Sequence, residues 1–172
     1  GILTGTGNVT VTGTATLNGG SHRGAGQTII GNTATGTLGS SFDLDSGRQL
    51  VNHSANLSAT AGNFNLNSSN SVGSGSMINN GSFTVNPGTS FFQIFATNFG
   101  STDNGADALF TNAGTGTLVK NGAGILYVDT RFTNAGTLTI NQGEVNLRRA
   151  STYQSGSSVS GAGTLVLNDS IG

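Results

Sequence analysis

The chain has 172 residues, of which 34% are apolar and only 8% are Asp, Glu, Lys or Arg, and its net charge is −1. Soluble domains carry roughly 25% charged residues, so Thr, Ser, Asn and Gly must cover most of the surface. The low charge argues against nucleic acid or an anionic membrane as partner, and no apolar run approaches the roughly 20 residues of a transmembrane segment. The length suits a single domain, 1–172.

Strand-like segments follow one another in chain order as variants of one repeat, in which apolar residues precede a polar corner. The motif FTNAG occurs twice, at 110–114 and 132–136. The last apolar residues of the successive repeats are Ile30, Val51, Ile78, Phe110, Phe132 and Tyr153, which are 21, 27, 32, 22 and 21 residues apart. Periods of this length are typical of solenoids, and the two long steps predict insertions near 65–75 and 91–108.

Within one repeat the apolar residues alternate as they do in short β-strands. Leu138 and Ile140 share one parity, and Val145 and Leu147 share another. Strands of three to five residues can bury themselves only if each pairs with its counterpart one repeat away, about 4.8 Å along an axis. The sequence therefore predicts an all-β fold, a right-handed parallel β-helix (β-solenoid) of about seven to eight coils, with the hand taken from the default for parallel crossovers.

This arrangement assigns a structural position to each residue of the repeat. Asn112 and Asn134 are expected to form a ladder at a corner, which Gly114 and Gly136 allow the backbone to turn. The structural core is predicted to contain Phe110, Phe132, Leu138, Ile140, Val145 and Leu147. Further inward residues are expected at Leu57, Phe64, Leu66, Phe83, Val85, Leu118, Leu126, Leu165 and Leu167.

The segment from Phe110 to Leu147 resembles repeats of large secreted bacterial proteins, including autotransporter-like, filamentous-haemagglutinin-like and PEP-CTERM-type surface proteins. The segment from Gly7 to Ile30 looks like the lead-in of the same proteins, so the resemblance covers most of the chain. It implies a β-solenoid that is secreted or held at the bacterial cell surface, with an adhesive or scaffolding role and no catalytic centre. The absence of cysteine agrees with an extracellular location.

Neither end of the chain shows the polar or helical cap that a solenoid usually needs. The residues expected to mediate assembly are Ile2, Leu3, Val9, Val11, Leu165 and Leu167. We expect copies of the chain to join head to tail into an extracellular filament or scaffold. The alternative is a monomeric adhesin or glycan-binding fragment of a longer autotransporter-like protein, which would contact a surface glycan or a host cell. Since the chain starts at Gly1, any targeting segment is expected upstream or already removed.

The segment 103–107 has the clustered oxygen ligands and the glycine that a calcium loop needs. It lacks the alternating ligand series and the terminal Glu of an EF-hand, so a solvated loop is the competing interpretation. If a metal binds, calcium is the predicted ion and Asp103 and Asp107 are its predicted ligands. No other cofactor is expected.

The sequence does not predict an enzyme. Asp43 and Asp45 have a spacing that suits acid–base chemistry or a metal, but no His, Tyr or third acid follows nearby, so we interpret them as outward polar residues. Polysaccharide-cutting β-helix enzymes need converging acids and aromatic platforms, whereas this chain has seven acids, two Tyr and no Trp. His22 and His53 have no Cys, Asp or Glu partner at ligand spacing. The segment 120–122 is interpreted as a turn.

Threonines at alternate positions suggest a further, minor alternative, which is ice binding. They occur as Thr4/Thr6, Thr10/Thr12, Thr12/Thr14/Thr16, Thr33/Thr35/Thr37, Thr115/Thr117 and Thr137/Thr139. The sequence does not show these pairs at one register in every coil. Threonine is also a common exposed strand residue, so the pairs alone do not identify a function.

Overall fold

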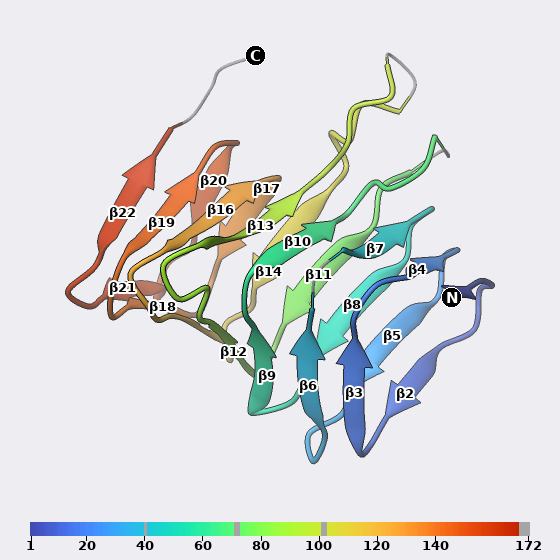
Figure 1. The fold of residues 1–172 in the computed structure, drawn as a ribbon, viewed down its shortest axis with the longest axis horizontal. Helices are drawn as coiled ribbons and strands as arrows, with labels where there is room; N and C mark the ends of the chain where they lie inside the picture. Colours follow the sequence, from blue (N-terminus) through green and yellow to red (C-terminus); the bar gives the residue numbers. More distant parts are fainter. Residues whose placement is uncertain (40, 71–72, 101–102, 169–172) are drawn as a thin grey trace.

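The computed structural model describes residues 1–39, 41–70, 73–100 and 103–168. These residues form 22 β-strands and no helix, so this part of the chain has no helix that could cross a membrane. The strands belong to three parallel sheets that together enclose the core (Figure 1).

Each coil contributes one strand to each sheet, which we call sheets A, B and C. Sheet A contains β1 (Ile2–Leu3), β4 (Ser21–Arg23), β7 (Phe42–Asp45), β10 (Gly62–Asn65), β13 (Phe91–Phe95), β16 (Ile125–Asp129), β19 (Glu144–Leu147) and β22 (Thr164–Leu167). Sheet B contains β2 (Val9–Val11), β5 (Gln27–Ile30), β8 (Gln49–Asn52), β11 (Ser76–Asn79), β14 (Leu109–Asn112), β17 (Arg131–Asn134) and β20 (Ser151–Tyr153). Sheet C contains β3 (Thr14–Leu17), β6 (Thr35–Leu38), β9 (Asn56–Ala59), β12 (Ser82–Val85), β15 (Thr117–Lys120), β18 (Thr137–Ile140) and β21 (Ser158–Ser160).

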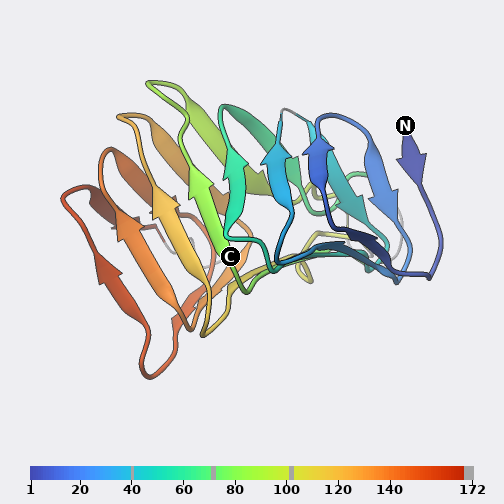
Figure 2. The ribbon, with the colours of Figure 1, turned by 90° about the horizontal axis from the view of Figure 1, so that it is seen from below.

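Seven coils of three strands are therefore complete, from β1–β3 to β19–β21, and β22 adds one more strand to sheet A. Figure 2 shows the successive coils stacked from the N-terminal to the C-terminal end. The predicted all-β parallel solenoid of seven to eight coils is confirmed.

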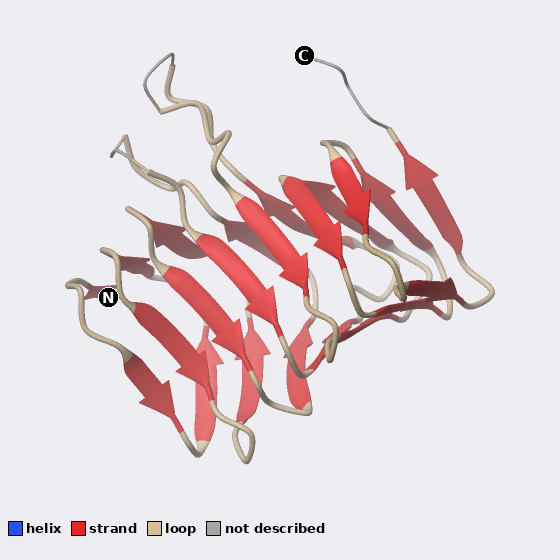
Figure 3. Cartoon of the chain, turned by 180° about the vertical axis from the view of Figure 1, so that it is seen from behind, coloured by secondary structure: helices blue, strands red, loops and turns tan. Residues whose placement is uncertain are grey.

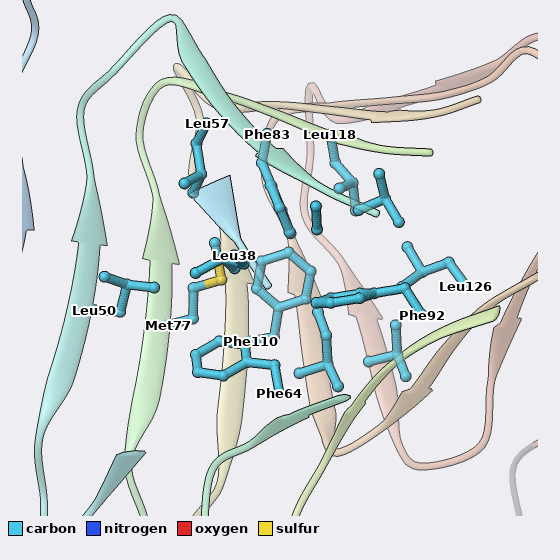
Figure 4. Close-up of a cluster of buried hydrophobic side chains, with 14 of the residues drawn as sticks. Leu38, Leu50, Leu57, Phe64, Met77, Phe83, Phe92, Phe110, Leu118 and Leu126 are labelled. Atoms are coloured by element: carbon cyan, nitrogen blue, oxygen red, sulfur yellow. The ribbon is translucent and has the colours of Figure 1, made fainter. Parts of the chain in front are cut away.

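The core consists of inward columns, which are the register-matched inward positions of successive coils. One column in sheet B runs through Leu50, Met77, Phe110 and Phe132, all at most 1% exposed. Phe110 and Phe132 have ring centroids 5.2 Å apart. Figure 4 shows how such side chains from the three sheets meet in one apolar cluster. Burying each phenylalanine contributes about 2 to 3 kcal/mol.

An asparagine ladder occupies the next inward column of sheet B. Asn52 Nδ2 donates to Asn79 Oδ1 at 2.7 Å, Asn79 Nδ2 to Asn112 Oδ1 at 2.8 Å, and Asn112 Nδ2 to Asn134 Oδ1 at 2.8 Å. All four side chains are fully buried. The Nδ2 groups also donate to backbone carbonyls at the start of the next coil's sheet C strand, as from Asn112 to Thr137 O at 3.0 Å. The predicted ladder residues Asn112 and Asn134 thus form its C-terminal half.

Of the two predicted corner glycines, only Gly136 occupies a position where an added Cβ would clash with the backbone. Gly136 lies just before β18, where an added Cβ would be 2.2 Å from Gly116 O and 2.3 Å from Ala113 O. Its counterpart in the preceding coil is Gly116, because Thr117 pairs with Thr137. A Cβ at Gly114 would meet only Ala135 O, at 4.0 Å. Gly114 lies in the corner turn between β14 and β15, which has two extra residues in that coil, but this position does not require a glycine.

Both predicted insertions lie at the corner between sheets A and B. They are the connection 66–75 between β10 and β11 and the connection 96–108 between β13 and β14. In the following coil, Thr130 alone makes the same connection, between β16 and β17. The second insertion is shorter than the predicted 91–108, because 91–95 form strand β13, which pairs with β10 and β16.

Candidate functional site

The two long connections project together from one corner of the solenoid (Figure 3). They are tied at their base, where Leu66 N donates to Phe95 O at 2.7 Å. They are the most irregular part of the described chain, and irregular loops on a rigid scaffold are where binding residues concentrate. This corner is therefore the candidate binding site of the described chain.

Asn67 joins the two connections. Its Nδ2 donates to Thr97 O and to Asp103 Oδ1, both at 2.7 Å, and its backbone N–H donates to Asn65 Oδ1 at 3.0 Å. Asn67 is fully buried, and Asp103 is 6% exposed. These bonds leave Asn67 Oδ1 and Asp103 Oδ2 buried without a hydrogen-bond partner in the structure, although burying an unpaired polar atom costs about 1 to 3 kcal/mol.

A hollow of about 100 Å³ opens beside these groups. Its lining contains Gly73, Ser74, Asp103, Asn104, Gly105, Ala106 and Asp107. The structure thus brings the predicted calcium ligands Asp103 and Asp107 to one hollow. Within the described ranges, no group of three or more His, Cys, Asp or Glu side chains could hold a metal ion. Calcium binding through Asp103 and Asp107 stays a prediction.

Asp43 and Asp45 lie in different environments, so the interpretation of both as outward polar residues is wrong for Asp45. Asp45 is fully buried and accepts hydrogen bonds from Ser46 N, at 2.9 Å, and from the Ser69 hydroxyl. Arg23 Nε lies 4.0 Å from its Oδ2. Asp43 is half-buried; burial raises the pKa of its carboxyl, the Asp45 charge adds to the rise, and Arg23 opposes it. Asp45 therefore fixes the 66–75 connection to β7.

His22 belongs to a polar cluster in the N-terminal coils. Its Nδ1 lies 2.9 Å from Thr28 Oγ1, which accepts a bond from Arg48 Nε at 3.2 Å. Burial, reinforced by the Arg48 charge, lowers the pKa of His22. Arg48 is 1% exposed and also donates to Gly7 O at 3.0 Å and Gln27 O at 2.9 Å. The cluster therefore joins the first coils. His53, the second histidine of the chain, is exposed.

Lys120 is a buried cation, although the sequence predicts a turn at 120–122. It is instead the last residue of β15, fully buried, and only 121–122 continue into the corner. Its Nζ donates to Asn121 O and Gly122 O at 2.8 Å and to Gln142 O at 3.2 Å. Burial lowers the pKa of this ammonium group. Lys120 therefore satisfies corner carbonyls of two coils.

The predicted core residues Phe110, Phe132, Leu138, Ile140, Val145 and Leu147 are all at most 2% exposed.

The residues predicted for assembly lie in the end coils: Ile2 and Leu3 in β1, Val9 and Val11 in β2, and Leu165 and Leu167 in β22. Leu165 is partly buried and Leu167 is 60% exposed. Leu167 pairs with Leu147 and so occupies an inward position as predicted, although its side chain is exposed.

Comparison with known proteins gives no relative from which a function could be taken. No family model matches the chain, and no similar curated protein or solved structure was found.

Proposed function

We propose that this chain is a non-enzymatic structural rod, which joins copies of itself head to tail into a filament or scaffold outside a bacterial cell. The observation that carries the proposal is the state of the inward columns in the end coils. Positions that are fully buried in the middle of the solenoid become exposed there while their side chains stay apolar.

At the C-terminal end, two columns end in exposed aliphatic side chains. Leu167 continues the column of Val128 and Leu147 in sheet A, which are at most 1% exposed, yet Leu167 is 60% exposed. Val159 follows Leu138 in sheet C and is 43% exposed. These side chains lack the apolar layer that the next coil would supply.

At the N-terminal end, the column of Leu50 and Thr28 in sheet B ends in Val9, which is 39% exposed. Ile2, in edge strand β1, is 66% exposed. Unpaired strand edges with apolar side chains favour association with a further strand. Stacking one copy on the next with β1 beside β22 would continue sheet A across the junction, because β1 and β22 are the two edge strands of that sheet.

A head-to-tail contact of this kind is heterologous, and it produces open filaments when the rotation does not close a ring. The external location is supported by the resemblance to secreted bacterial solenoid proteins, the low charge and the lack of cysteine. The surface of such a filament would be mainly hydroxyl and amide groups, with few charges to repel neighbouring copies.

The test is electron microscopy and sedimentation velocity of the purified chain across a concentration series. We expect oligomers that lengthen with concentration, with an axial repeat near the length of the rod. Leu167→Lys should keep the chain monomeric, because it places a charge in the junction. The control is Val166→Lys on the same strand, since Val166 pairs with Asn146 on the outward face and should leave assembly intact.

Monomeric rods at every concentration would contradict the filament proposal. That result would favour the alternative, in which the solenoid acts alone as an adhesin or continues into further coils of a longer protein. Circular dichroism of both variants distinguishes loss of assembly from loss of the fold.

A further inference from the structure

The outward positions of sheet C form two continuous columns of short, uncharged side chains, which we call the hydroxyl face. One column contains Thr14, Thr35, Asn56, Ser82, Thr117, Thr137 and Ser158, and the other contains Thr16, Thr37, Ser58, Thr84, Val119, Thr139 and Ser160. Every one of the seven complete coils contributes to both columns. Threonine pairs occupy both columns in three coils, at Thr14/Thr16, Thr35/Thr37 and Thr137/Thr139, so the pairs themselves do not recur in every coil, as expected from the sequence.

The other two sheets have no comparable face. The matching outward column of sheet A contains Gln93, Tyr127 and Asn146, with Arg148 stacked 3.6 Å over the Tyr127 ring. In sheet B, the outward column changes from Val51 to Ile78 and then Thr111. The uniform composition is thus specific to one side of the solenoid and is not a general property of its exterior.

The hydroxyl groups are held in register but only weakly bonded to one another. Thr35 Oγ1 donates to Thr14 Oγ1 at 3.4 Å, and Ser158 Oγ donates to Thr137 Oγ1 at 3.3 Å, both long for O–H···O bonds. Threonine is β-branched and has few rotamers, so little side-chain entropy is lost when its hydroxyl and methyl groups meet an ordered surface. The face is therefore pre-organised and can still bond to water.

The repeat of the face is close to that of ordered water. Successive coils of a parallel sheet are about 4.8 Å apart. Hydrogen-bonded oxygens lie about 2.75 Å apart, and tetrahedral geometry then places two waters that share a neighbour roughly 4.5 Å apart. The mismatch of roughly 0.3 Å per coil accumulates to only about 1 Å over three or four coils. A charged or bulky side chain would interrupt such a match, and these columns contain none.

We propose that the hydroxyl face binds ice, with the threonine hydroxyls continuing the hydrogen-bonded lattice and the methyl groups excluding liquid water between them. This function is independent of head-to-tail assembly, because it uses one lateral face and leaves both ends free.

The test is thermal hysteresis of the purified wild-type chain, together with the habit of ice crystals grown in its presence. We expect measurable hysteresis and faceted crystals. Thr84→Lys, in the middle of the face, should reduce the hysteresis several-fold, and Thr139→Lys should do the same two coils away. The matched control is Thr133→Lys in β17 of the same coil, because Thr133 continues the outward column of Thr111 in sheet B.

Absence of hysteresis and unshaped ice with folded wild-type protein would overturn the proposal, even if the face binds a polysaccharide. An equal loss in the Thr133→Lys control would overturn the assignment to this face. Thermal melting of each variant shows whether it is folded, and sedimentation shows whether assembly has changed, so failure of the ice proposal is distinguishable from failure of the filament proposal.

Discussion

Four asparagine side chains lie in a column that is otherwise apolar, and all four are fully buried. They are tolerated because each of the first three amides donates both to the next amide and to a backbone carbonyl, as Asn79 does to Asn112 Oδ1 and Thr117 O, and Asn134 donates to Ser158 O. A buried polar network is favourable only when each member has its partners. The ladder therefore fixes the register of sheet B, since a slip of one residue would place amides against apolar side chains.

Replacing Asn112 with Ala should lower the free energy of unfolding by about 2 to 4 kcal/mol. The change leaves Asn134 Oδ1 without its donor and removes one acceptor from Asn79. Chemical denaturation measures the effect. Asn141→Ala is the matched control, because Asn141 Nδ2 donates to Asn121 Oδ1 at 2.9 Å in an exposed pair; its cost should be within about 0.5 kcal/mol. Equal losses in both variants would contradict a special role for the buried ladder.

The lowered pKa of His22 predicts a dependence of stability on pH. The folded state binds the His22 proton more weakly than the unfolded state, whose histidine has a pKa near 6.5. As the pH falls below about 6.5, the unfolded state therefore takes up more protons, and stability decreases. Denaturation midpoints measured between pH 7.5 and 5 should fall, and His22→Gln should weaken this dependence. His53→Gln, at an exposed position, should leave it unchanged; an effect as large as that of His22→Gln would contradict the assignment.

At the scale of the element, close packing at the corners decides where glycine is needed. A Cβ at Gly116 would be 2.2 Å from Asn79 O and 2.6 Å from Asn112 Oδ1. Gly116→Ala should therefore lower the free energy of unfolding by at least about 2 kcal/mol. Gly114→Ala should change it by less than about 0.5 kcal/mol, although both glycines follow the first FTN motif. Thermal melting of the two variants is the measurement, and a larger loss for Gly114→Ala would contradict the structural alignment.

The same corner explains how far the sequence could predict the elements. Strand type and parallel stacking followed from alternation and period, and the pairing of Phe110 with Phe132 followed from the identical motifs. Elsewhere the sequence alignment of repeats by their last apolar residue was wrong by one position, because Phe110 pairs with Met77 and not with Ile78. Outward positions of sheet B also carry aliphatic residues, so an apolar residue alone does not identify the inward face.

The candidate sites were less predictable than the strands. Asp103 could be named from the composition of its loop, but its buried contact with Asn67 joins residues that are 36 positions apart. The hydroxyl face was missed for a related reason. Asn56, Ser58 and Val119 interrupt the threonine pattern in the sequence, and only strand pairing shows that they occupy the same two columns.

At the scale of the whole molecule, each coil contacts mainly the coils on either side, so stability should vary along the rod. Backbone groups of β14 and β17 pair on both sides, whereas β20, β21 and β22 have one neighbouring strand each. Local opening should therefore begin at the ends. In dilute solution, we expect amides of β14 and β17 to exchange at least about 100-fold more slowly than those of β20 to β22.

The proposed head-to-tail assembly would add a concentration dependence to this gradient. A partner that binds only the folded end coil stabilises it by mass action, so hydrogen exchange in β20 to β22 should slow as the protein concentration rises. Exchange in β14 and β17 should change little, because these strands already have both neighbours. Leu167→Lys should abolish the concentration dependence and keep the gradient. A gradient that is the same at every wild-type concentration would mean that the end coils do not bind one another, whatever the lateral faces bind.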